Sequence, residues 1–297
     1  MGAAYAGIFH NMDNSCVSFV AADARYERLR QYGLIVNGKH YDIPVLRPED
    51  LSAPSDLVIV AVKNQHLQDA IRDMKNRVGD RTIIISVMNG IESEEKIGAV
   101  YGMGKVLYAI SVGIDALREK NRVNYARQGK IFFGEAQNTI ISERVKRVQE
   151  FFDKAGIIYE TPPDMIRSIW WKFMVNVGIN QASAVLRAPF SVFQTLPEAR
   201  NLMESAMREV IMLSGRIGVN LSEEDIETFN KVLLNINPQG KTSMLQDIEA
   251  GRKTEVEMFA GKVIELGRKL AVPTPVNEKL FDAIRKIEAV NNSANVT

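Results

Sequence analysis

The sequence has little of what disulfides, metal centres and membrane spans require. Its 297 residues include one cysteine, Cys16, and three histidines. A single cysteine excludes an intramolecular disulfide and a cysteine-cluster metal site, and three histidines leave little room for a histidine-rich metal centre. No apolar run approaches the roughly 20 residues that span a bilayer, and no secretory signal is present. We therefore expect a cytoplasmic protein with no metal and no membrane partner.

An excess of charge of either sign is also missing. Lys and Arg total 37 and Asp and Glu total 36, so the formal net charge is +1. We expect no nucleic-acid partner, because no Arg/Lys stripe with interleaved aromatic residues is present. Hydrophobic residues make up 46% of the chain and charged residues 25%, which excludes a disordered chain. At roughly 100–200 residues per domain, the length suits two domains.

The first half of the chain alternates short apolar runs with amphipathic stretches. The runs that predict strands are residues 17–20, 56–62, 82–87, 105–110, 130–134 and, as a last edge strand, 157–160. Nearly continuous β-branched runs are typical of parallel strands covered on both faces. The intervening stretches that predict helices are residues 24–32, 65–77, 92–100 and 142–155. This alternation predicts an open, doubly wound α/β sheet.

From Asp164 onward the pattern is helical only. The predicted helices are residues 164–186, 196–217, 222–235, 249–270 and 275–290. The pair Pro162-Pro163 locks the chain into an extended turn, and Asp164 can cap the helix that follows. We therefore predict an α/β domain over residues 1–163 and an all-helical domain over residues 164–297. The Met- and Leu-rich stretch 202–213 is expected to be core, with a homodimer face as the alternative.

Residues 1–9 predict a helix in which small residues stand where it would pack closely against a sheet. A dinucleotide-binding domain opens with a strand, a Gly-x-Gly-x-x-Gly turn and a helix whose N-terminus meets the pyrophosphate. No strand and no Gly-x-Gly precede this helix, but Gly2 fits the third glycine. The alternative interpretation is an ordinary helix.

Charged residues follow the strand predicted at 17–20. Asp23 could hold the ribose 2′-OH of NAD, whereas Arg25, with Arg28 a turn later, could accept the 2′-phosphate of NADP. A solvated cap at a strand–helix junction is the alternative. Two later strands end in Lys63 and in Asn89-Gly90. Lys63 would point toward a ligand crevice or cap the strand at the surface, and Asn89 would meet a nicotinamide ribose or form a tight turn.

Two stretches of the second half carry polar side chains of candidate function. Lys172, Asn176 and Asn180 are spaced by four residues, which places them on one helix face among Phe, Met, Val and Ile. Polar groups in such surroundings are usually functional or held by partners, and a solvated stripe is the alternative. Ser243 and Glu255 could hydrogen-bond a hydroxylated substrate, although their charged segment also fits an exposed helix.

These residues carry a resemblance that spans almost the whole chain. The chain resembles the ketopantoate reductase (2-dehydropantoate 2-reductase) family, NADPH-dependent enzymes of pantothenate and coenzyme A biosynthesis. The matching motifs are Val60-Ala61-Val62-Lys63, Asn89-Gly90, Gly134-Glu135, Trp170-x-Lys172-x-x-x-Asn176-x-x-x-Asn180, Ser243-Met244-Leu245-Gln246-Asp247, Thr254-Glu255 and Pro273-Thr274-Pro275. The resemblance implies a Rossmann domain followed by an all-helical domain, with a small-molecule 2-oxo acid as substrate.

The resemblance also implies roles for single residues. Lys172 would be the general acid that protonates the alkoxide formed when hydride reaches a ketone carbon. Asn176, Asn180 and Ser243 would bind the substrate. Glu255 would be a second catalytic residue, which holds the substrate hydroxyl or organises the site, and would also contact the cofactor. The residues that the resemblance places at the cofactor are Gly2, Arg25, Lys63 and Asn89, of which Lys63 and Asn89 would contact both ligands.

Three positions depart from the family pattern. The family's first strand and first two glycines have no counterpart, so we expect the true start to lie upstream of Met1. Ala22 stands where the family usually has an arginine, with Arg25 or Arg28 as the substitute. Phe190 stands where a further substrate-binding asparagine is often found. These departures leave two alternatives to a ketopantoate reductase: a reductase of another branched 2-oxo acid, or a cofactor-deficient homologue without enzymatic activity.

Overall fold

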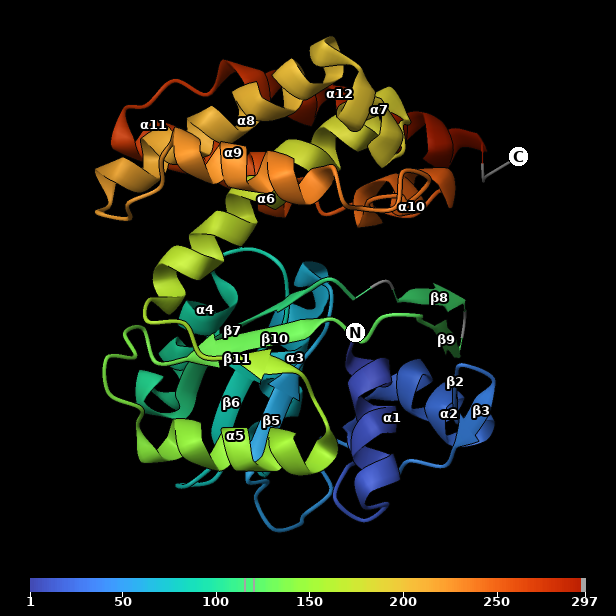
Figure 1. The fold of residues 1–297 in the computed structure, drawn as a ribbon. Coiled ribbons are helices and arrows are strands. Elements are labelled where there is room, and N and C mark those ends of the chain that lie inside the picture. The colour runs from blue at the N-terminus through green and yellow to red at the C-terminus, as the bar shows by residue number, and fades with distance from the viewer. Residues whose placement is uncertain (115, 120, 295–297) are drawn as a thin grey trace. The chain divides into compact units, whose positions relative to one another are not determined.

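The computed structural model describes residues 1–114, 116–119 and 121–294 (Figure 1). The chain forms two compact units, Met1–Ile166 and Arg167–Thr297. The first unit combines sheets and helices, and the described part of the second is helical. The predicted fold class, an α/β domain followed by an all-helical one, is confirmed.

A five-stranded sheet forms the centre of the first unit. In spatial order its strands are β11 (Tyr159–Glu160), β10 (Lys130–Gly134), β7 (Val106–Val112), β6 (Ile83–Ser86) and β5 (Leu57–Val60). Strands β5, β6 and β7 are parallel, whereas β10 runs antiparallel to β7 and parallel to β11. The sheet is therefore mixed, and the last strand lies at its edge as predicted.

Alternate residues of β6 face two different cores. Ile83 and Ile85 pack in a cluster with residues of α1 (Gly2–Met12) and α5 (Glu143–Ala155). Ile84 packs in a second cluster with residues of α3 (Leu67–Asp73) and α4 (Ser93–Tyr101). Helices thus cover both faces of the sheet, which explains why the β6 sequence is continuously apolar.

Strand β5 differs from β6 although both have β-branched sequences. In β6 every residue is buried, whereas in β5 only Val60 is buried and the other three residues are partly exposed. The prediction of a strand covered on both faces is nevertheless confirmed, because Leu57 and Ile59 pack against the first cluster and Val58 packs against the second, to which Val60 belongs. The greater exposure of β5 reflects its position, because it ends the five-stranded sheet and pairs with β6 alone within the described residues.

Smaller sheets complete the first unit. Strand β1 (Phe19–Val20) pairs in parallel with β4 (Val45–Leu46). A four-stranded sheet has the order β3 (Lys39–Tyr41), β2 (Leu34–Val36), β9 (Arg122–Asn124) and β8 (Leu117–Glu119). Of these strands, only the one at 17–20 was predicted, and it is shortened to two residues. The remaining helical segments are α2 (Asp23–Tyr32), η1 (Asn64–His66), η2 (Lys75–Arg77) and η3 (Met103–Lys105), so the helix predicted at 65–77 is divided into three pieces.

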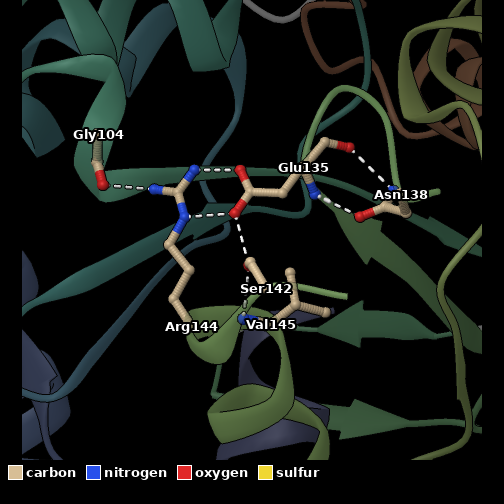
Figure 2. A network of polar contacts seen from close by, with 6 residues as sticks. All are labelled: Gly104, Glu135, Asn138, Ser142, Arg144 and Val145. Carbon is tan, nitrogen blue, oxygen red and sulfur yellow. Dashed lines mark hydrogen bonds and ion pairs between the residues drawn. The ribbon is translucent and has the colours of Figure 1, made fainter. Parts of the chain in front are cut away.

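A polar network holds the loop that follows β10 (Figure 2). The Glu135 carboxylate accepts hydrogen bonds from Ser142 Oγ (2.7 Å) and from Nε (2.6 Å) and Nη2 of Arg144, and Arg144 Nη1 donates to the Gly104 carbonyl. These hydrogen bonds, first that from Arg144, lower the pKa of Glu135 below its ordinary value. The network therefore keeps Glu135 ionised and joins three separate segments of the chain.

The same loop fixes the start of the first helix of the second half. Asn138 Nδ2 donates to the Pro162 carbonyl (2.8 Å), and the Asn138 backbone N–H donates to the Pro163 carbonyl (2.8 Å). The backbone N–H of Met165 donates to the Ala136 carbonyl (3.1 Å). Residues 136–138 and 162–165 are thus hydrogen-bonded to each other within the first unit, and the helix begins at Met165.

The helical unit is built from helices of 5 to 22 residues. They are α6 (Met165–Leu186), α7 (Phe190–Thr195), α8 (Pro197–Arg216), α9 (Glu223–Leu233), α10 (Ser243–Glu249), the π-helix η4 (Glu257–Gly261), α11 (Lys262–Leu270) and α12 (Pro275–Ala294). Ser222 is the N-cap of α9 and forms a capping box with Asp225. The expectation that 202–213 is core is largely confirmed, since Met203, Met207 and Leu213 are fully buried while Met212 is exposed.

The helix predicted over residues 249–270 is found only over residues 257–270, as η4 and α11. Helix α10 already begins at Ser243 and ends at Glu249, and helical structure resumes only at Glu257. The N–H of Gly251 donates to the Ile248 carbonyl (3.2 Å) and that of Arg252 to the Asp247 carbonyl (2.8 Å). This is the Schellman pattern of helix ends, and Gly251 provides the positive φ of 62° that it requires. A single glycine therefore ends the helix, although the charged sequence on either side fits an exposed helix.

Candidate functional site

Helix α6 carries three of the predicted site residues on successive turns. Lys172, Asn176 and Asn180 follow one face of the helix, as the four-residue spacing predicts. The Nζ atom of Lys172 is buried. Asn180 is 6% exposed and Asn176 is partly buried, yet neither side-chain amide has a hydrogen-bond partner among the residues that the structure describes. The two carboxamides are therefore open to hydrogen bonding with water or with a ligand.

The residue after Asn180 explains how this helix is held in place. Gln181 is fully buried, and its Nε2 donates to Val177 O (2.7 Å) and Asn277 Oδ1 (3.0 Å). Its Oε1 accepts from the backbone N–H of Ala260 (3.0 Å) in the π-helix. Asn277 in turn donates to the buried carboxylate of Glu209 (2.7 Å). A satisfied polar network of this kind fixes side chains and helices in one arrangement.

Of the other two predicted residues of the helical unit, Ser243 begins α10 and Glu255 lies in the break that follows this helix. Ser243 is the first residue of α10 and is exposed, next to the N-cap Thr242, whose hydroxyl accepts from the Leu245 N–H (3.2 Å). Glu255 is partly buried in the non-helical segment that precedes the π-helix, and its carbonyl accepts from the N–H groups of Met258 and Phe259. π-Helical turns occur frequently at functional sites.

In the α/β unit, Lys63 and Asn89 follow neighbouring parallel strands. The pairing of Val60 with Ser86 brings the carboxyl ends of β5 and β6 to the same edge of the sheet. Lys63 is the N-cap of η1, and Asn89 lies in the turn before α4, both partly buried. A hydrogen bond between Ser86 Oγ and Ser93 Oγ (2.8 Å) spans the Asn89 turn. Ligands of open α/β sheets bind at this edge.

Basic residues on α2 lie just beyond β1. Arg25 lies at the surface, yet nearby protein atoms partly desolvate its guanidinium and so lower its pKa, as does the like charge of Arg28, while Asp73 acts in the opposite direction. Asp23, at the start of α2, has a positive φ of 47°. The two like charges repel each other, and a bound anion would offset this repulsion through charge-assisted hydrogen bonds.

Gly2 lies at the start of α1 against the end of β5. A Cβ atom at this position would lie 2.8 Å from Cβ of Ala61, closer than side chains tolerate. The third glycine of the dinucleotide fingerprint permits such close packing of helix on strand. The structure thus gives a physical reason for glycine at this position.

The structure also reveals residues that were not predicted. Gln181 and Glu209 are buried polar residues whose partners are far away in the sequence. Glu288 lies on α12 and binds the segment that contains Glu255. A buried polar residue in an apolar helix face was the available signal for Gln181, but nothing in one sequence names its partner.

Two classes of site are not found in the described part of the chain. Residues 1–114, 116–119 and 121–294 contain no group of three or more His, Cys, Asp or Glu residues arranged to hold a metal ion. None of the helices in these ranges is long and apolar enough to cross a bilayer.

Comparison with known proteins gives one consistent result. Residues 1–138 match the model of ketopantoate reductase PanE/ApbA, and residues 164–288 match the model of its C-terminal part. A 2-dehydropantoate 2-reductase of Archaeoglobus fulgidus is 28% identical over 277 residues, which are 92% of this chain and 90% of the relative.

Solved structures share the fold at lower sequence identity. A 2-dehydropantoate 2-reductase from Methylococcus capsulatus superposes with a TM-score of 0.81 at 22% identity, covering 98% of this chain and 94% of that one. A D-mandelate dehydrogenase solved with NADH and anilino(oxo)acetate gives a TM-score of 0.86 at 20% identity, covering 98% and 96%. The fold and the matches define a Rossmann-type oxidoreductase. Within this class, the chain belongs to the ketopantoate reductase family.

Proposed function

We propose that this protein is a 2-dehydropantoate 2-reductase, which reduces ketopantoate to pantoate with NADPH. The observation that carries the proposal is the face of α6. There, a lysine with a buried Nζ atom is followed by two carboxamides that have no hydrogen-bond partner among the described residues. Carboxamides without a protein partner can hydrogen-bond a ligand in place of water, so their donors and acceptors would suit a carboxylate and a carbonyl group of a substrate.

Reduction of a ketone requires a proton donor and groups that orient the substrate, and this helix face carries both. The hydride for the ketone carbon would come from a nicotinamide cofactor when one is bound. Lys172 then holds an ammonium group next to the carbonyl oxygen, stabilises the developing alkoxide and donates the proton that completes the alcohol. Asn176 and Asn180 orient the substrate without adding a competing charge. Ser243 binds the substrate from α10, and Glu255 accepts a hydrogen bond from its hydroxyl group.

The residues of the α/β unit fit a nicotinamide dinucleotide. Gly2 allows the close approach of α1 to β5, and the N-terminus of such a helix favours a pyrophosphate. Lys63 and Asn89 would hold the nicotinamide end, since both follow strands that end at the same sheet edge. Arg25, with its like-charged neighbour Arg28, would bind a 2′-phosphate and so favour NADPH over NADH.

One observation supports a second candidate, a reductase of another branched 2-oxo acid. Phe190 opens α7, and its backbone N–H donates to the carbonyl of Gly240 (3.1 Å). Its ring leaves little space beside Gly240, three residues before Ser243. A bulky aromatic side chain beside the segment that carries Ser243 would favour a different substrate shape.

The two candidates are separated by NADPH oxidation assays with ketopantoate and with other branched 2-oxo acids. We expect the highest kcat/KM with ketopantoate, and Phe190→Asn should raise it further if the ring restricts the pocket. A higher kcat/KM for another 2-oxo acid would replace the first candidate by the second. If fluorescence titration shows NADPH binding but no 2-oxo acid is reduced, both candidates are wrong. If NADPH does not bind either, the protein is a cofactor-deficient homologue.

A further inference from the structure

The carboxylate of Glu288 on α12 lies in an unusual place for a charged group. Glu288 is 7% exposed, and its Oε1 accepts two hydrogen bonds from Thr254, one from the backbone N–H (2.7 Å) and one from Oγ1 (2.7 Å). Its Oε2 accepts from Nη1 of Arg285 (3.1 Å). Burying a carboxylate is unfavourable unless it is fully hydrogen-bonded, so these bonds offset its desolvation.

Thr254 extends this hydrogen-bond network to the residues next to it. It is itself buried, and its Oγ1 also accepts from the backbone N–H of Val256 (3.3 Å). Glu255 therefore lies between two residues whose backbone N–H groups are both fixed, one by Glu288 and one by the Thr254 hydroxyl. Because Thr254 and Val256 lie outside any helix, their N–H groups bind these side-chain acceptors in place of helical carbonyl groups.

A second anchor holds the far side of the same segment. Gln181 of α6 accepts the N–H of Ala260 in the π-helix (3.0 Å), and the rings of Phe173 and Phe259 lie 6.4 Å apart. The π-helix is thus bound to α6 independently of Glu288. Loss of Glu288 should therefore disturb the segment around Glu255 locally, with the π-helix still attached.

We propose that Glu288 is a positioning residue of this enzyme, which holds the Glu255 backbone through Thr254 and so sets where the Glu255 carboxylate meets the substrate. The inference rests on the proposed function for the role of Glu255. Glu288 acts through Thr254 and Glu255 and does not itself bind the substrate or the cofactor. Its charge matters because hydrogen bonds to an ionised acceptor are roughly twice as strong as neutral ones.

The first experiment measures the anchor without any activity. Amide hydrogen exchange of residues 253–256 is compared between the wild type, Glu288→Ala and the control Arg285→Gln. The control removes the exposed ion pairs of Arg285 with Glu288 and Glu257 but keeps both hydrogen bonds to Thr254. We expect faster exchange in this segment for Glu288→Ala alone. Unchanged exchange in Glu288→Ala would overturn the inference, whatever the enzyme reduces.

The second experiment is a double-mutant cycle on kcat/KM for the 2-oxo acid. We expect Glu288→Ala to lower kcat/KM about 10-fold in the wild type, the equivalent of a charged hydrogen bond. The same change should have almost no effect in a Glu255→Gln background, because a positioning residue acts through the residue it positions. Equal effects in both backgrounds would show a general loss of stability and would overturn the inference.

Two conservative variants of Thr254 test the same hydrogen bonds if Glu288→Ala folds poorly. Thr254→Ser retains both donors to Glu288 and should keep near wild-type kcat/KM, whereas Thr254→Val loses the hydroxyl and should resemble Glu288→Ala. Equal activity of the two variants would contradict the inference. If Glu255→Gln itself retains full activity, the proposed role of Glu255 is wrong, and the exchange data still report whether Glu288 holds the segment.

Discussion

The candidate residues of the α/β unit and those of the helical unit are placed by different physical means. In the α/β unit, Lys63 and Asn89 lie where strands end, so the backbone of β5 and β6 determines their positions. In the helical unit, Lys172 and Asn180 lie on a helix that is fixed by the buried side chain of Gln181. The comparison teaches that the first set depends on sheet topology, and the second on a few buried polar side chains.

The two sets of residues are proposed to bind different ligands, the cofactor in the α/β unit and the substrate in the helical unit. Substitutions in one set should therefore change kinetics or affinity for its own ligand and leave the other ligand's binding unchanged. Lys172→Ala should show the largest effect, a loss of about 10³-fold in kcat, because general acid catalysis and charge stabilisation disappear together. Steady-state kinetics measure the loss, and fluorescence titration should show nearly unchanged NADPH affinity. Lys172→Arg, which keeps the charge, serves as the matched control. An equal loss of NADPH affinity in Lys172→Ala would mean a structural role and would break the comparison.

A smaller effect is expected from the buried carboxamide. Asn180→Ala should lower kcat/KM for the 2-oxo acid about 10- to 100-fold, because a buried hydrogen bond to the substrate is lost. The affinity for NADPH should stay as in the wild type. Asn180→Asp is the informative companion, since it keeps the size but repels a substrate carboxylate. A wild-type KM for both variants would place the substrate elsewhere.

The smallest effect should come from the surface of the α/β unit. Arg25→Ala should weaken NADPH binding about 10-fold, because one charged contact to a 2′-phosphate is removed. Binding of NADH, which lacks this phosphate, should change little, and the KM for the 2-oxo acid should be unaffected. Titrations with both cofactors measure the difference. Equal weakening of NADPH and NADH would show that Arg25 does not read the 2′-phosphate.

The sequence predicted what depends on local pattern. The strand at 130–134 is found with its predicted bounds, and the helix at 142–155 begins one residue later, with Ser142 as its N-cap. The shared helix face of Lys172, Asn176 and Asn180 also follows from spacing alone, because the helical period fixes it. The roles of these residues in catalysis and binding remain predictions.

What was missed depends on contacts between distant parts of the chain. The edge position of β5 cannot be read from its apolar sequence, since the same composition occurs in the fully buried β6. The break after α10 was not predicted, because Gly251 lies within a charged stretch that also fits an exposed helix. The anchor of Thr254 on Glu288 joins residues 34 positions apart, so only the folded chain reveals it.

The Glu135 network makes the stability of the folded protein depend on pH in acid. Because Arg144 and Ser142 lower the pKa of Glu135, this carboxylate stabilises the folded state fully above its ordinary value of 4.5. That stabilisation is lost as the pH falls through the lowered value, when Glu135 takes up a proton. Acid should then loosen the loop at 135–138 together with the prolines bound to it. Equilibrium urea denaturation should show a flatter pH dependence below the ordinary value in Glu135→Gln than in the wild type.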